Sequence, residues 1–386
     1  MRFLKKSSGV YQKGRAWVEV DLESLRHNVA TLKNMLPDGC ELMPAVKADA
    51  YGHGALRICK ELNRLGVNAF CVATVFEGVE LCRQHIKGEI LVLGYTHPEL
   101  FEVARRHKLM LTVVDSEHAR AMRAFGKKLR VHLAVDTGMH RLGEPAHNFD
   151  ALLDMLASSN LSVEGIYSHL SAQSCAFTQT QVDRFNELPG KLQEHGFKAP
   201  KAHLQSSYGL LQRPDLHYSY ARVGIALYGA YEHDSLRPVL SVKTRVSTVK
   251  TVARGEAIGY GLGCVAPRAM KIAVLSIGYA DGLPRALSCG VGKVLIHGLF
   301  ADILGYVCMD QTIVNISQIT GVKQGDTAVI LGQDKAASIT ALDIAAQLNT
   351  VPNEVLSRLG TRLPRVYFHF ECKAESYSLC RPARSP

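Results

Sequence analysis

The stretch ELMPAVKADAYGHG at residues 41–54 joins an apolar run to a glycine-rich turn. Its apolar part, Leu42–Val46, has the composition of a buried strand, and Lys47 stands where that strand would end. In a parallel α/β barrel the catalytic groups project from this end of the strands. Spacing alone favours an ordinary surface lysine, so the meaning of this stretch depends on the sequence around it.

Seven further apolar runs of strand length follow, at Ala69–Thr74, Ile90–Leu93, Met110–Val114, Val131–Val135, Val163–Tyr167, Ala202–Leu204 and Val223–Leu227. Most of the intervening segments have helical spacing, and so does the segment before the first run, where apolar residues recur at Leu22, Leu25, Val29, Leu32 and Met35. Eight buried strands that alternate with helices predict an eight-stranded parallel α/β barrel of the TIM type. An open doubly wound sheet is the alternative, because periodicity does not show closure.

The pattern becomes β-rich after about Arg237. Strands are predicted at Val239–Val252, Lys271–Ile277, Lys293–His297, Ala301–Val307, Thr312–Ile316 and Thr327–Leu331. One helical patch, Ser338–Asn349, follows them with Ser338 or Thr340 as its N-cap. We therefore expect an N-terminal extension at 1–14, a barrel domain at 15–236, a mostly β domain at 237–370 and a tail at 371–386.

The composition is that of a folded protein with a sizeable core. Of 386 residues, 47% are hydrophobic and 21% are charged, which excludes disordered, collagen-like and coiled-coil chains. The net charge of +10 favours anionic ligands, but its basic residues are dispersed and form no stripe with interleaved aromatics, so a nucleic-acid binder is not expected.

The cysteines and the N-terminus suggest a cellular compartment. The ten cysteines are scattered, form no CxxC pair and have no zinc-ligand spacing with the histidines, so we expect a reducing environment and no metal. No signal peptide is recognisable, and no run of about 18 apolar residues occurs, so a cytoplasmic protein without membrane contact is expected.

Eight motifs of the chain resemble, in their order, those of one enzyme family. They are AVKADAYGHG at 45–54, VDTGMHRLG at 135–143, SHLSAQ at 168–173, HLQSSYG at 203–209, YARVGIALYG at 220–229, AIGYGLG at 257–263, IGYADGLPR at 277–285 and GYVCMDQ at 305–311. In this order they resemble the alanine racemases, enzymes that use pyridoxal 5′-phosphate (PLP), from about Arg15 to Phe368. The resemblance implies a PLP-binding barrel, a β domain and a homodimer with composite active sites. It also implies a bacterial supply of D-alanine for peptidoglycan.

The resemblance implies two catalytic residues. Lys47 would form the Schiff base with PLP and move the substrate α-proton on one face. Tyr260, supplied by the other subunit, would act on the opposite face, with His169 and Arg222 favouring its phenolate. Arg222 would also meet the PLP ring nitrogen and leave it unprotonated, because arginine keeps its proton. An unprotonated ring nitrogen makes PLP a weaker electron sink, which favours proton exchange over transamination.

The remaining site residues follow from the same resemblance. The phosphate would be held by Tyr51, Ser206, Gly224, Ile225 and Thr361. The substrate carboxylate would meet Arg141 of one subunit and the Met309 backbone N–H of the other, with Asp310 beside it. Spacing alone would make the hydroxyl residues ordinary loop residues and Gly224 a packing glycine.

The chain departs from the common family pattern at four positions. Ala134 replaces a lysine, often carbamylated, that orients the arginine matching Arg141, and Tyr306 and Ser174 replace charged residues of the substrate entry. Thr361 replaces a pocket tyrosine, and the glycopeptide-resistance serine racemases also have a small polar residue there. A pocket discriminates weakly against one added hydroxyl, so serine or dual alanine and serine racemisation is the alternative to alanine.

Three further alternatives differ in class. A PLP decarboxylase of the same fold would need an acidic pocket, which the Arg141 and Met309 segments oppose. A non-catalytic PLP carrier would resemble the barrel alone, whereas the second domain with Tyr260 is present here. The glycine-rich GYGLGCVA at 259–266 does not open a helix after a strand and gives little support to dinucleotide binding.

Overall fold

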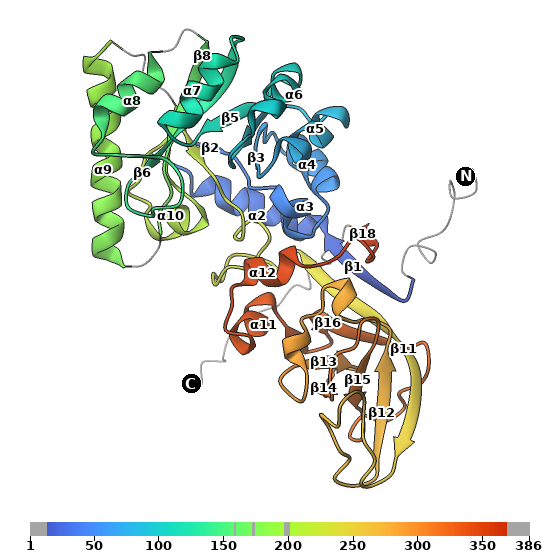
Figure 1. The fold of residues 1–386 in the computed structure, drawn as a ribbon. Coiled ribbons are helices and arrows are strands. Elements are labelled where there is room, and N and C mark those ends of the chain that lie inside the picture. The colour runs from blue at the N-terminus through green and yellow to red at the C-terminus, as the bar shows by residue number, and fades with distance from the viewer. Residues whose placement is uncertain (1–13, 158–159, 172–173, 197–200, 369–386) are drawn as a thin grey trace, which may run out of the picture.

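The computed structural model describes residues 14–157, 160–171, 174–196 and 201–368. The tail predicted at 371–386, and the predicted extension 1–14 except its last residue, lie outside the described residues. Figure 1 shows a helix-rich part that continues into a strand-rich part. No helix in the described ranges is long and apolar enough to cross a membrane.

The helix-rich part is built on parallel strands. Six of them form one parallel sheet in the order β3 (Ala69–Val72), β4 (Glu89–Val92), β5 (Met110–Val113), β6 (Leu129–Asp136), β8 (Leu161–Tyr167) and β9 (Lys201–His203), with the short β7 (Glu144–Pro145) beside β6. A separate parallel pair joins β2 (Glu41–Leu42) to β10 (Tyr220–Ala221).

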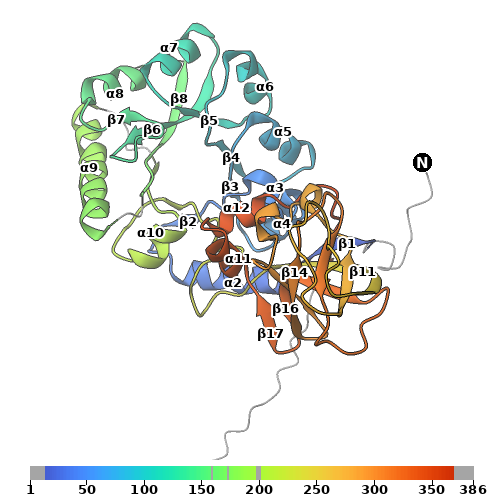
Figure 2. The same cartoon turned by 60° about the horizontal axis from the view of Figure 1, so that its bottom comes forward.

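Two bridges close these strands into a ring. Ala45 pairs in parallel with Cys71 of β3, and Ser206, just after β9, pairs in parallel with Arg222, just after β10. The order β2–β3–β4–β5–β6–β8–β9–β10–β2 is therefore a closed barrel of eight parallel strands, and the doubly wound alternative is excluded. Figure 2 shows the curved sheet with α5 to α9 on its outer side.

The eighth strand differs from the prediction. The apolar run 223–227 was expected to be a strand, but β10 ends at Ala221 and turns follow it. The backbone N–H groups of Gly224 and Ala226 donate to the Ser207 hydroxyl, 3.1 and 3.2 Å away, rather than to a neighbouring strand. The run is apolar because its side chains are buried, and burial alone does not distinguish a strand from a buried turn.

Helices cover the outside of the barrel. They are α2 (Leu22–Asn34), α4 (Ala55–Arg64), α5 (Val75–Arg83), α6 (Phe101–Arg106), α7 (Ser116–Ala124), α8 (Phe149–Leu156) and α9 (Cys175–Glu194), with the 3₁₀ turn η1 (Pro98–Leu100). The short segments α3 (Lys47–Tyr51) and α10 (Ser207–Gln212) follow strands β2 and β9 and contribute residues to the barrel mouth. The predicted helix before the first strand is α2, and its N-cap Asp21 accepts a hydrogen bond from the Glu23 N–H. Its apolar positions Leu22, Leu25 and Leu32 are fully buried.

The strand-rich part is a nine-stranded sheet in the order β17-β16-β13-β14-β15-β12-β11-β1-β18. Its strands are β1 (Ala16–Asp21), β11 (Leu240–Val252), β12 (Met270–Leu275), β13 (Lys293–Ile296), β14 (Leu299–Leu304), β15 (Thr312–Asn315), β16 (Thr327–Asp334), β17 (Ala337–Ile339) and β18 (Arg365–Phe368). Short 3₁₀ turns lie at η2 (Tyr279–Asp281) and η3 (Arg285–Leu287). The fold is thus a TIM-like barrel followed by a mostly β domain.

The two parts share strand β1. This strand belongs to the predicted 15–236 domain, but it pairs antiparallel with β11 and parallel with β18. The chain therefore starts in the second sheet before it enters the barrel. The domain boundary at 236/237 stays a prediction.

Two helices of the β domain lie between the sheet and the barrel. α11 (Ala341–Gln347) begins at Thr340, whose side chain forms a capping box with Asp343, so Thr340 and not Ser338 is the N-cap. α12 (Pro352–Ser357) follows it and contacts α3 of the barrel. This contact brings a residue of the second domain to the barrel mouth.

Candidate active site

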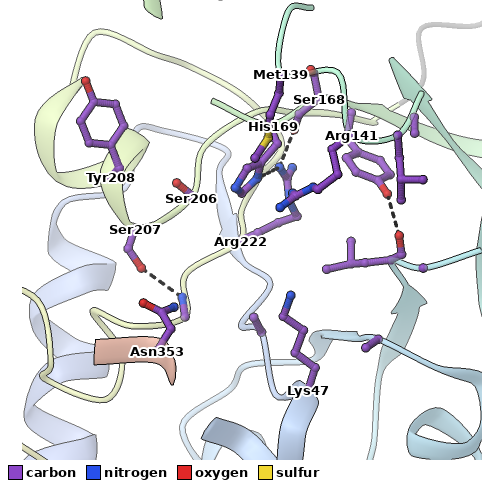
Figure 3. Close-up of a pocket in the computed structure, with 18 of the residues that line it drawn as sticks. Lys47, Met139, Arg141, Ser168, His169, Ser206, Ser207, Tyr208, Arg222 and Asn353 are labelled. Atoms are coloured by element: carbon purple, nitrogen blue, oxygen red, sulfur yellow. Dashed lines mark hydrogen bonds between the residues drawn. The ribbon is translucent and has the colours of Figure 1, made fainter. Parts of the chain in front are cut away.

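A cavity of about 520 Å³ opens at the carboxyl ends of the barrel strands. Five of its lining residues stand at or just after the ends of different strands: Lys47, Asp136, Ser168, Ser206 and Arg222. Figure 3 shows Lys47, Arg141, His169 and Arg222 gathered around this cavity. A site assembled from several strand ends is the usual place for catalysis in such a barrel.

Lys47 is followed by an unusual backbone segment. Ala48 to Tyr51 all have φ between +52° and +55°, a left-handed turn that non-glycine residues rarely adopt. Glu77 of α5 holds its start, because its carboxylate accepts hydrogen bonds from the N–H of Ala48 at 2.8 Å and of Ala73 at 2.7 Å. The turn fixes the backbone from which the Lys47 side chain enters the cavity.

The surroundings of Lys47 favour its neutral amine. Burial, followed by the nearby Arg141 guanidinium, lowers the pKa of Lys47 below its ordinary value. A lysine with a lowered pKa supplies the free amine that attacks a carbonyl group. Lys47 therefore has the chemistry of a Schiff-base residue.

Arg222 is held almost entirely by buried acceptors. It is 5% exposed, and its Nη1 donates to His203 Nδ1 at 2.6 Å and to the His203 carbonyl at 2.8 Å. Its Nη2 donates to the Ser168 carbonyl at 2.5 Å, and the guanidinium lies 5.0 Å from the centre of the Tyr167 ring. Burial lowers the pKa of Arg222. Its hydrogen-bond partners are a histidine nitrogen and backbone carbonyls, and no carboxylate is among them.

His169 lies next to this arginine in the cavity wall. Its Nδ1 is 3.4 Å from Arg222 Nη2 and can accept from it. Burial, with the charges of Arg222 and Arg141, lowers the pKa of His169 to about 3. The ring is therefore neutral at physiological pH.

One end of the cavity suits a phosphate ester. Tyr51, Ser206, Gly224 and Ile225, which the family resemblance assigns to the phosphate, all line the cavity. A Cβ at Gly224 would lie 2.8 Å from Tyr51 Oη, so the glycine lets the Tyr51 hydroxyl approach the backbone at this end of the cavity. Ser207 is a further lining residue that sequence reasoning missed, and its hydroxyl accepts from the Gly224 N–H.

The charge of the cavity wall also suits an anionic cofactor. Lys47, Arg141 and Arg222 line it, and the single carboxylate among its described lining residues is Asp136. That carboxylate accepts from the N–H groups of Gly138 at 2.9 Å and His140 at 3.0 Å. The cations therefore remain available to a phosphate or a carboxylate, which fits PLP and an amino acid.

Arg141 is positioned by the loop after β6. Asp136 closes this loop, since its Oδ2 also lies 2.8 Å from His140 Nδ1. Arg141 is exposed at the cavity rim. Ala134 is 2% exposed below it and offers no group to orient the guanidinium.

Three predicted residues lie outside this cavity. Tyr260 is 71% exposed and Met309 is 53% exposed on the surface of the β domain. Asp310 is exposed there too and accepts from Arg362 Nη2 at 2.6 Å. One protomer therefore does not bring Tyr260, Met309 or Asp310 to Lys47.

The predicted role of Thr361 in holding the phosphate stays a prediction. Thr361 is exposed and does not line the cavity, whereas Asn353, from α12, does and hydrogen-bonds Tyr51. Figure 3 shows Asn353 beside Ser207 at the cavity wall. Pro352 signals that a helix starts there, but the sequence does not show which residue of that helix faces the barrel.

In the described ranges, no group of three or more His, Cys, Asp or Glu side chains could hold a metal ion. The eight described cysteines are free thiols, of which Cys175 and Cys289 are exposed and Cys59 and Cys71 are buried.

Comparisons with known proteins agree with this arrangement. Residues 20–232 match the family described as "Alanine racemase, N-terminal domain", and residues 239–367 match "Alanine racemase, C-terminal domain". An alanine racemase of Nostoc is 39% identical over 91% of this chain and 95% of its own.

A second relative is longer than this chain. An amino-acid racemase of Enterococcus faecalis is 37% identical over 90% of this chain, which spans 51% of that relative's length. The solved alanine racemase of Bartonella henselae "with covalently bound pyridoxal phosphate" has a TM-score of 0.82 and 26% identity, covering 92% of this chain and all of its own. Both family domains and full-length relatives thus match, and the chain belongs to the alanine racemase family.

Proposed function

We propose that the protein is a PLP-dependent alanine racemase that works as a homodimer. The observation that carries this proposal is the placement of Lys47, with a lowered pKa, in the same cavity as the buried cation Arg222. Family membership and relatives named alanine racemase support the same reaction. The product, D-alanine, would serve peptidoglycan synthesis.

The cavity residues divide the work of binding the cofactor. Tyr51, Ser206, Gly224 and Ile225 would hold the phosphate, and Lys47 would anchor the cofactor covalently. Arg222 would donate to the ring nitrogen and keep its own proton. When bound, PLP supplies the electron sink that stabilises the electron pair left by the departing α-proton.

Racemisation needs one proton carrier on each face of the substrate. Lys47 is the carrier on one face, and its lowered pKa favours the neutral amine that can accept a proton. Tyr260 of the partner subunit is the proposed carrier on the other face. The positive charge of Arg222 would favour the phenolate of Tyr260. His169 would add no charge, because its ring is neutral.

The substrate carboxylate would be bound by cationic and backbone donors. Arg141 offers its planar set of N–H groups at the cavity rim. The backbone N–H of Met309 of the partner subunit would complete this binding, with Asp310 of the partner subunit beside it.

The exposed apolar side chains support the homodimer. On the β domain, Tyr260, Leu262 and Met309 are 71%, 74% and 53% exposed. At the barrel mouth, Phe76 after β3 and Tyr95 after β4 are 66% and 56% exposed. Exposed large apolar side chains are candidates for a subunit interface, and a dimer that pairs these two surfaces would bring Tyr260 to the Lys47 cavity.

Serine is a second candidate substrate, favoured by one observation. Asn353 places an amide in the cavity wall, and the part of this amide that does not bond Tyr51 can pair with a substrate hydroxyl. Alanine remains the proposed preferred substrate, since the relatives named alanine racemase cover nearly the whole chain.

Subunit mixing tests the composite site. Lys47→Ala and Tyr260→Phe homodimers should each be nearly inactive, while unfolded and co-refolded mixtures should form heterodimers with one intact site and one doubly defective site. About one quarter of wild-type turnover should return at equal mixing, because about half of the dimers are then mixed. Failure of the mixture to exceed the separate variants, with mixed dimers confirmed by mass, would contradict the shared site.

A further inference from the structure

The hydrogen bonds of Arg222 continue into the barrel interior. His203 accepts from Arg222 through Nδ1 at 2.6 Å, and His203 Nε2 lies 2.7 Å from His132 Nδ1. The rings of His203 and His132 are 0% and 1% exposed. Two buried imidazoles therefore stand in series behind the arginine that faces the cavity.

The chemistry of arginine fixes the tautomer of the first ring. A guanidinium has N–H donors and no acceptor, so His203 Nδ1 must present its lone pair to Arg222. Burial, with the charge of Arg222, lowers the pKa of His203 well below its ordinary value, so this ring is neutral. Its single proton therefore resides on Nε2.

The second ring must then accept. His203 Nε2–H points to His132 Nδ1 at 2.7 Å, so that nitrogen carries a lone pair and the His132 proton resides on Nε2. Burial, with the charge of Arg222, lowers the pKa of His132 to about 3, so it too is neutral. Only one arrangement of protons gives each hydrogen bond along Arg222, His203 and His132 one donor and one acceptor.

We propose that His132 is a positioning residue that fixes the tautomer of His203 and, through it, the place of Arg222. This inference rests on the proposed function, because it concerns the arginine that would meet the cofactor ring nitrogen. His132 touches neither substrate nor cofactor in this account. Its role is to make the lone pair of His203 Nδ1 available to Arg222.

The packing of the barrel interior supports this role. His203 lies between the Tyr167 ring, stacked at 13°, and the edge of Tyr220. His132 is pressed against Gly165, where any Cβ would collide with its ring. Both rings are thus held by close packing, and His132 Nδ1 is the hydrogen-bond partner that the structure gives His203 Nε2.

The opposite tautomer would place two donors against each other. With the proton on His203 Nδ1, an N–H of the ring would meet an N–H of Arg222 across 2.6 Å. His132 disfavours this tautomer because it offers an acceptor to the Nε2–H of His203. Without His132 that N–H would lose its partner, and an unsatisfied buried donor is costly, so the proton would shift toward Nδ1. The guanidinium would then move away from His203 and from its direction toward the cavity.

Nitrogen-15 NMR of histidine-labelled protein, loaded with PLP, reads the tautomers directly. In the wild type we expect His203 and His132 both to be protonated on Nε2 and unprotonated on Nδ1. In His132→Leu we expect His203 to populate the Nδ1–H form. In His132→Asn, whose side-chain oxygen can accept near the former Nδ1 position, the Nε2–H form of His203 should return.

Kinetics supply a matched comparison. We expect His132→Leu to lower kcat for alanine about 10-fold, the size of one lost buried hydrogen bond, with KM nearly unchanged. His132→Asn should recover most of that loss. His118→Leu is the control, since His118 is a buried histidine that bonds the Thr96 carbonyl at 2.9 Å and does not touch Arg222.

The outcomes separate this inference from the proposed function. Wild-type His203 protonated on Nδ1, or equal His203 tautomers and equal kcat in the Leu and Asn variants, would overturn the role of His132. Absence of racemisation in the wild type would overturn the proposed function, while the NMR result would still decide the tautomer question. Should His132→Leu fail to fold, the wild-type and His132→Asn spectra still decide it.

Discussion

The Glu77 carboxylate accepts a hydrogen bond from the Ala48 N–H, 2.8 Å away, on the residue directly after Lys47. Glu77 belongs to α5, which follows the next barrel strand, so two βα units meet at the active-site lysine. The same carboxylate binds the Ala73 N–H at 2.7 Å and completes the capping box of α5 with Thr74. One side chain thus anchors a helix and the left-handed turn.

Glu77→Gln should impair both tasks. The amide NH₂ replaces one acceptor oxygen and opposes a backbone N–H, so we expect about 1 kcal/mol lower free energy of unfolding and roughly 10-fold lower kcat/KM. Urea unfolding and the chiral assay measure the two effects.

Thr74→Ala is the matched control for this variant. It removes the cap hydrogen bond from the Glu77 N–H and should cost about 1 kcal/mol of stability, but it leaves the Glu77 carboxylate on Ala48. Its kcat/KM should stay near wild type. An equal loss of activity in both variants would show that Glu77 acts through α5 alone.

Gly224→Ala should destabilise the protein through Tyr51. The new Cβ would lie 2.8 Å from Tyr51 Oη, closer than packed atoms allow, so we expect a lower Tm and weaker PLP binding. Adding Tyr51→Phe removes the oxygen that the Cβ meets and should restore the Tm, although PLP binding stays weak. A Tm that the second substitution does not restore would place the strain elsewhere.

Asn353 rather than Thr361 should affect the choice between alanine and serine. Asn353→Leu keeps the branched shape but removes the amide from the cavity, so kcat/KM for serine should fall more than kcat/KM for alanine. Thr361→Ala should change neither value, because Thr361 is exposed outside the cavity. A larger effect of Thr361→Ala would reverse this assignment.

Stability should fall at mildly acidic pH. Burial lowers the pKa of His53 to about 4, those of His132 and His169 to about 3 and that of His203 well below 6.5. The unfolded chain binds protons near pH 6.5 and the folded chain does not, so this stability is complete above pH 6.5 and is lost as the pH falls toward the folded values.

The expected size follows from four such groups. Each histidine contributes about 1.4 kcal/mol per pH unit below 6.5, so the free energy of unfolding should be roughly 5 kcal/mol lower at about pH 5.5 than at about pH 7.5. His132→Asn should show about one quarter less loss. Equal urea stability of the wild type at the two pH values would contradict neutral buried histidines.

The sequence predicted the barrel well because its strands are buried on both faces. Continuous apolar runs such as Met110–Val114, separated by helical segments, are typical of strands in a parallel sheet that is buried on both faces. The same signal failed at 223–227, where the residues are buried in a turn whose N–H groups bond a serine side chain. Burial was visible in the sequence, but the hydrogen-bond partner was not.

The site residues divide in the same way. Lys47, His169 and Arg222 each follow a barrel strand, so the topology places them together and the motifs could predict them. Asn353 reaches the cavity through the packing of α12 on α3, a contact between segments roughly 300 residues apart that no local pattern indicates. Strand β1 is a similar case, since its partners β11 and β18 lie far along the chain.

The most direct test of the account is a chiral assay of the PLP-loaded protein with L-alanine and L-serine in parallel. We predict that L-alanine approaches equal amounts of the two enantiomers, with kcat/KM higher than for serine, and that Lys47→Ala abolishes the reaction. Unchanged L-alanine in the presence of protein whose cofactor absorbance shows attachment to Lys47 would contradict the proposed racemase.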